Sequence, residues 1–165
     1  MSRPIAIEDL ALRLPLKARL IGVDLGSKTI GLAISDVERR IASPFRTLPR
    51  TAFQKDADAL LAIFAEFEIA AVVLGLPLDL DGRDSPRAQS TRAFARNLAT
   101  RTDLPIAFWD ERFSTAVVLR SLIDNDVSRA RRAEVVDKLA AAYILHGALD
   151  RLAAVACKVN DSTKS

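Results

Sequence analysis

Three acidic residues lie in parts of the sequence that otherwise predict buried structure. Asp24 is inside the apolar run LIGVDLG, and Glu111 follows the apolar run PIAFWD. Asp137 belongs to AEVVDKLAAAYILHGALD, which has helical periodicity. Burying a carboxylate without compensation costs on the order of several kcal/mol. A shared hard cation such as Mg²⁺ or Mn²⁺ would compensate all three, because carboxylates are its preferred ligands.

Each acid also has a purely structural explanation. Asp24 could cap the turn at Gly26. Glu111 could be a first-turn acid that a helix dipole stabilises. Asp137 could pair with Lys138 or with an arginine. One such acid is weak evidence for a site, whereas three in one small domain favour a shared one.

The helix expected around Asp137 has a narrow stripe of small and apolar residues, and Asp137 is its one charge. At about 100° per residue, the members of the stripe lie within about 40 to 60° of Asp137. Small residues would also allow this helix to approach a sheet closely. The stripe consists of Ala133, Ala140, Ala141, Ile144 and Ala148.

Composition indicates one soluble domain. A chain of 165 residues, half of them hydrophobic, is long enough to bury a sizeable core. The net charge of +3 permits a polyanionic partner without requiring one. The single cysteine, Cys157, excludes an intrachain disulfide and fits a reducing compartment. The sequence has no uninterrupted apolar run of membrane-spanning length and no signal-peptide pattern. We therefore expect a cytoplasmic protein that does not associate with a membrane.

The periodicity predicts a mixed α/β sheet with helices on its faces. Three strands come first, at residues 19–26, 29–36 and 42–48, the third at an edge because it contains Pro44. Two further strands are expected at 70–77 and 105–111. Helices are expected at 53–68, 86–99 with Ser85 as N-cap, 114–123 and 132–154.

The two ends of the chain are set apart from this pattern. Residues 1–17 read as an N-terminal extension in which IEDLALRL forms a short amphipathic helix. Residues 18–156 form the single domain. Residues 157–165 are polar and are expected to be a flexible tail.

Four motifs in the same order resemble the YqgF/RuvX family of ribonuclease-H-like nucleases. They are VDLGSKTIGLAISD at 23–36, VVLGLPLDLDGRDSPRAQSTRAFARNL at 72–98, DERFST at 110–115 and VVDKLAAAYIL at 135–145. The resemblance extends from about Leu20 to Asp150. It implies a five-stranded mixed sheet of ribonuclease H type, flanked by helices.

The resemblance also implies divalent-metal hydrolysis of phosphodiester bonds, with Mg²⁺ or Mn²⁺ as cofactor. The catalytic and metal-binding acids of the family map onto Asp24, Glu111 and Asp137. The substrate stays open between two nucleic acids: structured RNA, in 5′-end maturation of pre-16S rRNA during ribosome biogenesis, and branched DNA, in Holliday junction resolution. A non-catalytic RNA-binding factor on a nuclease fold is a further alternative. The protein could act as a monomer or a homodimer.

Several basic residues are candidates for contacting a nucleic acid backbone. Each could equally be a solvated surface charge. The densest group, three arginines within four positions, is expected in a loop just before the Asp137 helix. The candidates are Lys28, Arg83, Arg87, Arg112, Arg129, Arg131 and Arg132.

A phosphate-binding ATPase is the main rival class. The stretch VDLGSKTIG also resembles the first phosphate loop of sugar kinases and actin-like ATPases. Those proteins need two such lobes. This sequence contains neither a second copy of the loop nor a GxxxxGK motif, which argues against the class.

Overall fold

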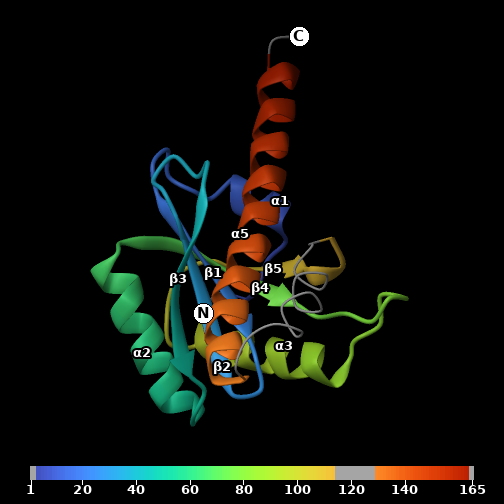
Figure 1. Cartoon of the computed structure of the whole chain (residues 1–165). Helices are drawn as coiled ribbons and strands as arrows, with labels where there is room; N and C mark the ends of the chain where they lie inside the picture. Colours follow the sequence, from blue (N-terminus) through green and yellow to red (C-terminus); the bar gives the residue numbers. More distant parts are fainter. Residues whose placement is uncertain (1–2, 114–128, 164–165) are drawn as a thin grey trace.

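A five-stranded mixed sheet forms the centre of the protein in a computed structural model (Figure 1). The structure describes residues 3–113 and 129–163, and for residues 113 and 129–134 it describes the backbone alone. The strand order is β3-β2-β1-β4-β5, with β1–β2 and β2–β3 antiparallel and β1–β4 and β4–β5 parallel. The strands are β1 Arg19–Leu25, β2 Thr29–Ser35, β3 Ala42–Pro49, β4 Ile69–Leu76 and β5 Ile106–Asp110.

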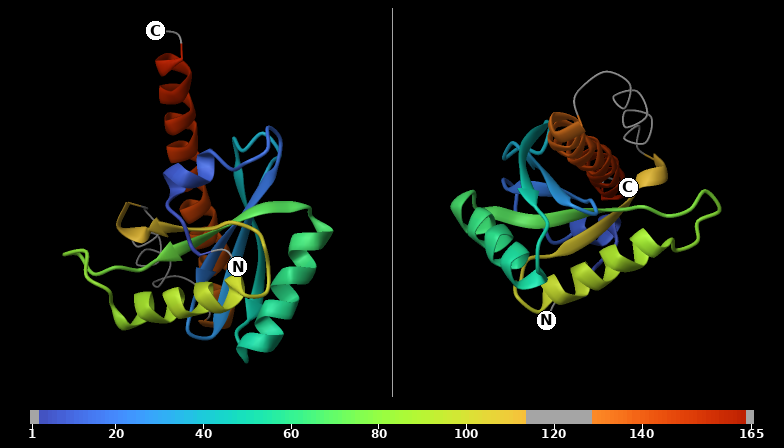
Figure 2. Two further views of the ribbon diagram at one scale, coloured as in Figure 1. Left: turned by 180° about the vertical axis from the view of Figure 1, so that it is seen from behind. Right: turned by 60° about the horizontal axis from the view of Figure 1, so that its bottom comes forward.

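Helices cover both faces of the sheet (Figures 1 and 2). Helices α2, Phe53–Glu66, and α3, Pro86–Ala99, pack on one face. The long helix α5, Arg129–Ser162, packs on the other face together with α1, Ile7–Ala11. A short 3-10 helix, η1, occupies Glu111–Phe113 directly after β5.

Alternation along the strands divides the core into two layers. On β1, Ile21 and Val23 belong to the layer under α2 and α3, while Leu20 belongs to the layer under α5. Successive strand residues point to opposite faces. Asp24 therefore lies on the α5 face, in line with Leu20 and Gly22.

Helix α5 lies directly against the sheet because glycines face it. A Cβ built on Gly22 of β1 would lie 2.7 Å from Leu145 Cβ and 2.8 Å from the Ala141 carbonyl oxygen. On β2, a Cβ on Gly31 would overlap the Asp137 carbonyl and lie 2.8 Å from Asp137 Cβ. Only hydrogen fits at these two strand positions, so α5 approaches the strand backbone itself.

The predicted strands and the helices at 53–68 and 86–99 are confirmed to within two residues, and β3 is an edge strand as its proline indicates. Ser85 is the N-cap of α3, and its hydroxyl accepts a hydrogen bond from the Ala88 backbone N–H at 3.0 Å. The helix expected at 114–123 lies outside the described residues.

Two predictions about the last helix are corrected. It begins at Arg129, so the arginines expected in a loop occupy its first turn. It ends at Ser162, so residues 157–162 continue the helix where a flexible tail was expected. Figure 1 shows these last turns extending beyond the sheet. Their side chains are largely exposed, so the sequence of these turns lacks the apolar periodicity that indicates a buried helix.

The N-terminal segment packs onto the domain. The Ile5 N–H donates to the Ile106 carbonyl at 2.8 Å, and Ile7 and Leu10 are buried in the layer under α5. The Arg151 guanidinium of α5 donates to Glu8 at 2.9 Å. Residues 5–10 thereby extend the core past β5.

By length and composition alone, one helix within the described residues is apolar enough to cross a membrane. It is the segment Val135–Ser162, with mean hydropathy 1.3 and 39% of its most apolar window buried inside the protein. A core helix of a soluble protein passes the same test. Since Ile144 and Leu145 are fully buried in the layer beneath α5, the helix gives only weak evidence for a membrane segment.

Replacing Gly31 with alanine should destabilise the protein, because the new methyl group would overlap the backbone of α5 at Asp137. Overpacking of this kind costs about 1–3 kcal/mol. The free energy of unfolding, measured by urea denaturation, checks it. Ser43→Ala on the exposed edge strand is the control and should change stability little. Unchanged stability of Gly31→Ala would show that α5 does not contact β2 this closely.

Candidate active site

Asp24 lies near the end of β1 and is completely buried. In the antiparallel pairing with β2 it lies opposite Gly31. Because Gly31 faces α5, so does its neighbour Asp24. The acid is thus a sheet residue aimed at the underside of the long helix.

Asp137 comes to the same place from α5. Its backbone lies over Gly31, the residue that pairs with Asp24. The Thr29 hydroxyl at the start of β2 donates a hydrogen bond to Asp137 Oδ2. This bond sets the direction of the Asp137 carboxylate. Asp24 and Asp137 are thus both neighbours of Gly31, Asp24 in the strand pairing and Asp137 through the backbone of α5.

Glu111 reaches the site from the far side of β4. It is the first residue of η1 and is 4% exposed. Its Oε1 lies 2.6 Å from the position that a Cβ on Gly75 would occupy. Gly75 follows Leu74, which pairs with Val23 in the parallel register, so Gly75 lies beside Asp24. Glu111 therefore passes over β4 toward β1.

The structure thus brings all three predicted acids to the α5 face, at the carboxyl ends of β1, β4 and β5. That edge is where ligands bind in open α/β sheets. The three carboxylates are oxygen ligands, the type that a hard cation prefers. Among the side chains that the structure describes, in residues 3–112 and 135–163, no group of three His, Cys, Asp or Glu meets the criterion for holding one metal ion.

Arg112 is held beside the site by Asp110. Its Nε donates to Asp110 Oδ1 at 3.0 Å and its Nη2 donates to Asp110 Oδ2 at 2.6 Å. Partial burial raises the pKa of the Asp110 carboxyl, but these hydrogen bonds outweigh burial and leave that pKa below its ordinary value. The same pair raises the pKa of the Arg112 guanidinium. Arg112 thus orients a carboxylate next to Glu111.

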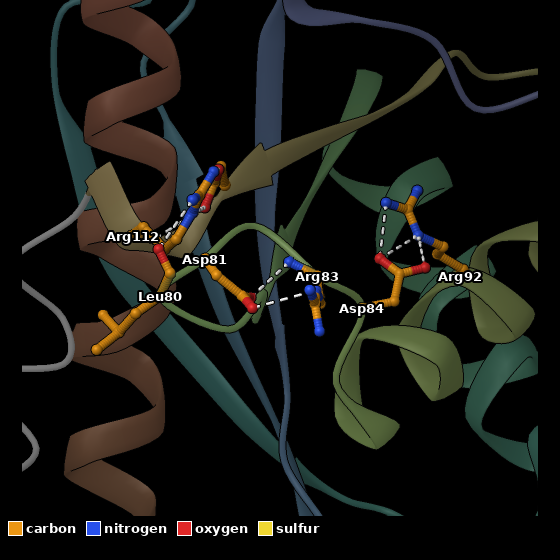
Figure 3. A network of polar contacts seen from close by, with 7 residues as sticks. Leu80, Asp81, Arg83, Asp84, Arg92 and Arg112 are labelled. Atoms are coloured by element: carbon orange, nitrogen blue, oxygen red, sulfur yellow. Dashed lines mark hydrogen bonds and ion pairs between the residues drawn. The ribbon is translucent and has the colours of Figure 1, made fainter.

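The loop between β4 and α3 is attached to this pair (Figure 3). Arg112 Nη1 donates to the Leu80 carbonyl at 3.4 Å. Further along the loop, Arg83 forms an ion pair with Asp81 at 3.2 Å, and its side chain is 85% exposed. The contact with Leu80 connects the loop to η1, which begins with Glu111.

Of the other basic candidates, Lys28 and Arg87 lie at the turn after Asp24. Lys28 is exposed in the turn between β1 and β2. Arg87, in the first turn of α3, donates from Nη2 to the Leu25 carbonyl at 3.3 Å. The side chains of Arg129, Arg131 and Arg132 lie outside the described residues, so their contact with nucleic acid stays a prediction.

Sequence reasoning missed two residues that support the site. The sequence marks Thr29 only as a strand residue, and nothing local indicates that its hydroxyl contacts Asp137 across 108 positions of sequence. Arg50 follows β3, and its Nη1 donates to the Gly26 carbonyl at 2.6 Å. The pairing of β2 and β3 brings Arg50 beside that turn, and a sequence carries no direct signal for this.

The mixed sheet, the long helix across one face and the acids at the strand ends define a ribonuclease-H-like domain. The chain belongs to the RuvX family, because the family model described as "RuvX: Holliday junction resolvase" matches residues 18–151.

Similar curated proteins cover most of this chain and most of their own length. A "Putative pre-16S rRNA nuclease" of Methylocella silvestris is 58% identical over 146 residues, which are 88% of this chain and 91% of the relative. A protein of the same name from Beijerinckia indica is 62% identical over 137 residues, covering 83% of each chain.

Among solved structures, the Thermus thermophilus RuvC structure in complex with a Holliday junction substrate has a TM-score of 0.51 at 14% identity. The match covers 82% of this chain and 96% of the RuvC chain. At this identity the likeness establishes the fold alone.

Thr29→Val should weaken Mn²⁺ binding at the carboxylates, because it removes the hydroxyl that orients Asp137. Losing such an orienting partner typically lowers metal affinity by about 10–100-fold. Calorimetric titration with Mn²⁺ measures this. Thr29→Ser keeps the donor and is the matched control. Equal affinity of wild type and Thr29→Val would exclude the orienting role.

Proposed function

We propose that this protein is a divalent-metal-dependent nuclease that hydrolyses phosphodiester bonds, with the 5′ end of pre-16S rRNA as its natural substrate. The observation that carries the proposal is the arrangement of Asp24, Glu111 and Asp137 on one face at the strand ends. The names of the curated relatives support the choice of RNA. A cytoplasmic location is part of the same proposal.

Asp24, Glu111 and Asp137 would hold the Mg²⁺ or Mn²⁺. When bound at such a site, divalent ions activate the attacking water and stabilise the leaving oxygen. The chain supplies no covalent nucleophile in this scheme. Its contribution is the placement of carboxylates, which lowers the barrier by positioning and electrostatics.

Individual side chains have separate tasks in this placement. Thr29 orients Asp137 through its hydroxyl, and Arg112 holds the Asp110 carboxylate through hydrogen bonds that lower its pKa. The tight contact of α5 with Gly31 restricts how far Asp137 can move from Asp24. Basic residues at the same edge would offset the repulsion between the acids and the phosphates of a substrate.

Holliday junction resolution is the second candidate, and the description of the matching family model favours it. One preparation of the protein should be given a 16S-precursor RNA and an immobile four-way DNA junction in Mg²⁺ or Mn²⁺. We expect faster cleavage of the RNA at its mature 5′ end. Symmetric nicking of the junction, with the RNA left intact, would replace our proposal by the resolvase. Binding without cleavage of either would indicate a non-catalytic RNA-binding factor.

Asp24→Asn and Asp137→Asn should each abolish cleavage while the protein stays folded. Each substitution keeps the side-chain shape and removes a charged ligand. The metal-induced rise in melting temperature should disappear with the activity, because fewer charged ligands remain. Gel assays and thermal melting with and without Mn²⁺ measure the two effects.

Asp9→Asn, an exposed substitution on α1, is the matched control and should leave both readouts unchanged. Wild-type cleavage by either asparagine variant would refute the catalytic assignment. A variant could lose cleavage while Mn²⁺ still raises its melting temperature. That result would show that the substituted acid is needed for cleavage but not for metal binding.

A further inference from the structure

Two arginines converge on the turn that follows Asp24. Arg87 Nη2 donates to the Leu25 carbonyl at 3.3 Å, and Arg50 Nη1 donates to the Gly26 carbonyl at 2.6 Å. These carbonyls belong to consecutive residues directly after Asp24. The arginines come from separate parts of the chain: Arg87 lies in the first turn of α3, and Arg50 directly follows β3. Both charges therefore lie at one end of β1.

The acceptors of these two guanidinium groups are neutral. Besides the Gly26 carbonyl, Arg50 contacts the Ser90 hydroxyl at 3.3 Å. Across the described part of the chain, no carboxylate pairs with either of them. Other arginines nearby do have acidic partners: Arg92 pairs with Asp84 at 3.0 Å and Arg83 with Asp81 at 3.2 Å.

Hydrogen bonds to carbonyls hold the two guanidinium groups in place without cancelling their charge. A guanidinium has five N–H donors, and the hydrogen bonds above use only some of them. Arg87 is exposed and Arg50 is half-buried, so solvent reaches the site. The Arg50 backbone N–H also donates to the Lys28 carbonyl at 2.9 Å, so the backbone of Arg50 is bound to the same turn, in which Lys28 is exposed.

A pair of oriented and uncompensated guanidinium groups is suited to a phosphate. Charge-assisted N–H···O bonds to phosphate oxygens are stronger than neutral ones, and a guanidinium can make two in parallel. Orienting both groups beforehand reduces the ordering cost of binding. An anion here would also relieve the repulsion between the two like charges.

We propose that Arg50 and Arg87 form a phosphate clamp that grips one phosphodiester of the substrate strand beside the carboxylate site. This inference rests on the nuclease function proposed above and adds Arg50, which sequence reasoning did not place in the site. The clamp holds the strand at the end of β1, so that the neighbouring phosphate lies at the sheet edge that carries the carboxylates. Arg50 and Arg87 are binding and positioning residues in this scheme.

The test compares Arg50→Gln, Arg87→Gln and the double variant with wild type. Glutamine retains an N–H donor for the carbonyls and loses the charge. The probe is a fluorescently labelled 16S-precursor RNA fragment, bound in EDTA over a series of KCl concentrations. Fluorescence anisotropy gives Kd at each salt concentration, and thermal melting reports folding.

We expect the double variant to bind on the order of tenfold more weakly at low salt. The slope of log affinity against log salt should fall by about 0.7–0.9 for each phosphate that the variant no longer neutralises. Arg50→Lys and Arg87→Lys should restore most of the slope because they restore the charge. Arg40→Gln is the matched control: Arg40 is 78% exposed, pairs with Glu38 and lies at the opposite end of β2.

An unchanged salt slope in the double glutamine variant would overturn the clamp, even if its melting temperature falls. In that case the two arginines only hold the turn. If wild type binds and cleaves RNA while the variants match it, the clamp fails and the nuclease proposal stands. If wild type binds neither the RNA nor a four-way junction, both fail together. If inorganic phosphate stabilises wild type but the variants keep full RNA affinity, the site takes a free anion and the strand assignment is overturned.

Discussion

The direct contact between α5 and the sheet determines where the acids of this protein lie. Gly22 and Gly31 remove the side chains that would otherwise separate helix from strands, and a side chain at either position would collide with α5. Layers with ordinary side chains between them pack about 10 Å apart, as stacked sheets do. Here the closer approach places Asp137 against the strand that pairs with Asp24. This contact of α5 with Gly22 and Gly31 involves backbone atoms. It therefore fixes the distance of α5 from the strands whatever the orientation of the carboxylate side chains.

Local signals predicted much of this arrangement. Apolar runs indicated the strands, the Ser85–Pro86 pair indicated the start of α3, and acids inside apolar segments indicated a site. What could not be predicted depends on tertiary contacts. Arg50 lies 24 positions from the carbonyl that it binds, and backbone acceptors leave no mark in a sequence. The last turns of α5 carry exposed side chains and therefore lack the periodicity that identifies a buried helix.

The turn between β1 and β2 contacts both Asp137 and the two arginines of the proposed clamp. Gly26 N–H donates to the Thr29 carbonyl at 2.8 Å and closes the turn. On the α5 side, the Thr29 hydroxyl contacts Asp137. On the α3 side, arginines contact the carbonyls of Leu25 and Gly26. A few residues thus couple the direction of a carboxylate to the position of two cations, and a shift of this turn would disturb both.

The charge distribution explains why such coupling is useful. Three carboxylates at one edge repel a polyanion, and a divalent ion reduces that repulsion only where it is bound. In the proposed clamp, the guanidinium groups of Arg50 and Arg87 would attract a nucleic acid backbone whether or not the ion is present. Since Glu111 and Asp24 are buried while Arg87 is exposed, a strand would meet the basic groups before the acids. Binding and hydrolysis would then depend on different residues of one sheet edge, joined by strand backbone that lies in direct contact with α5.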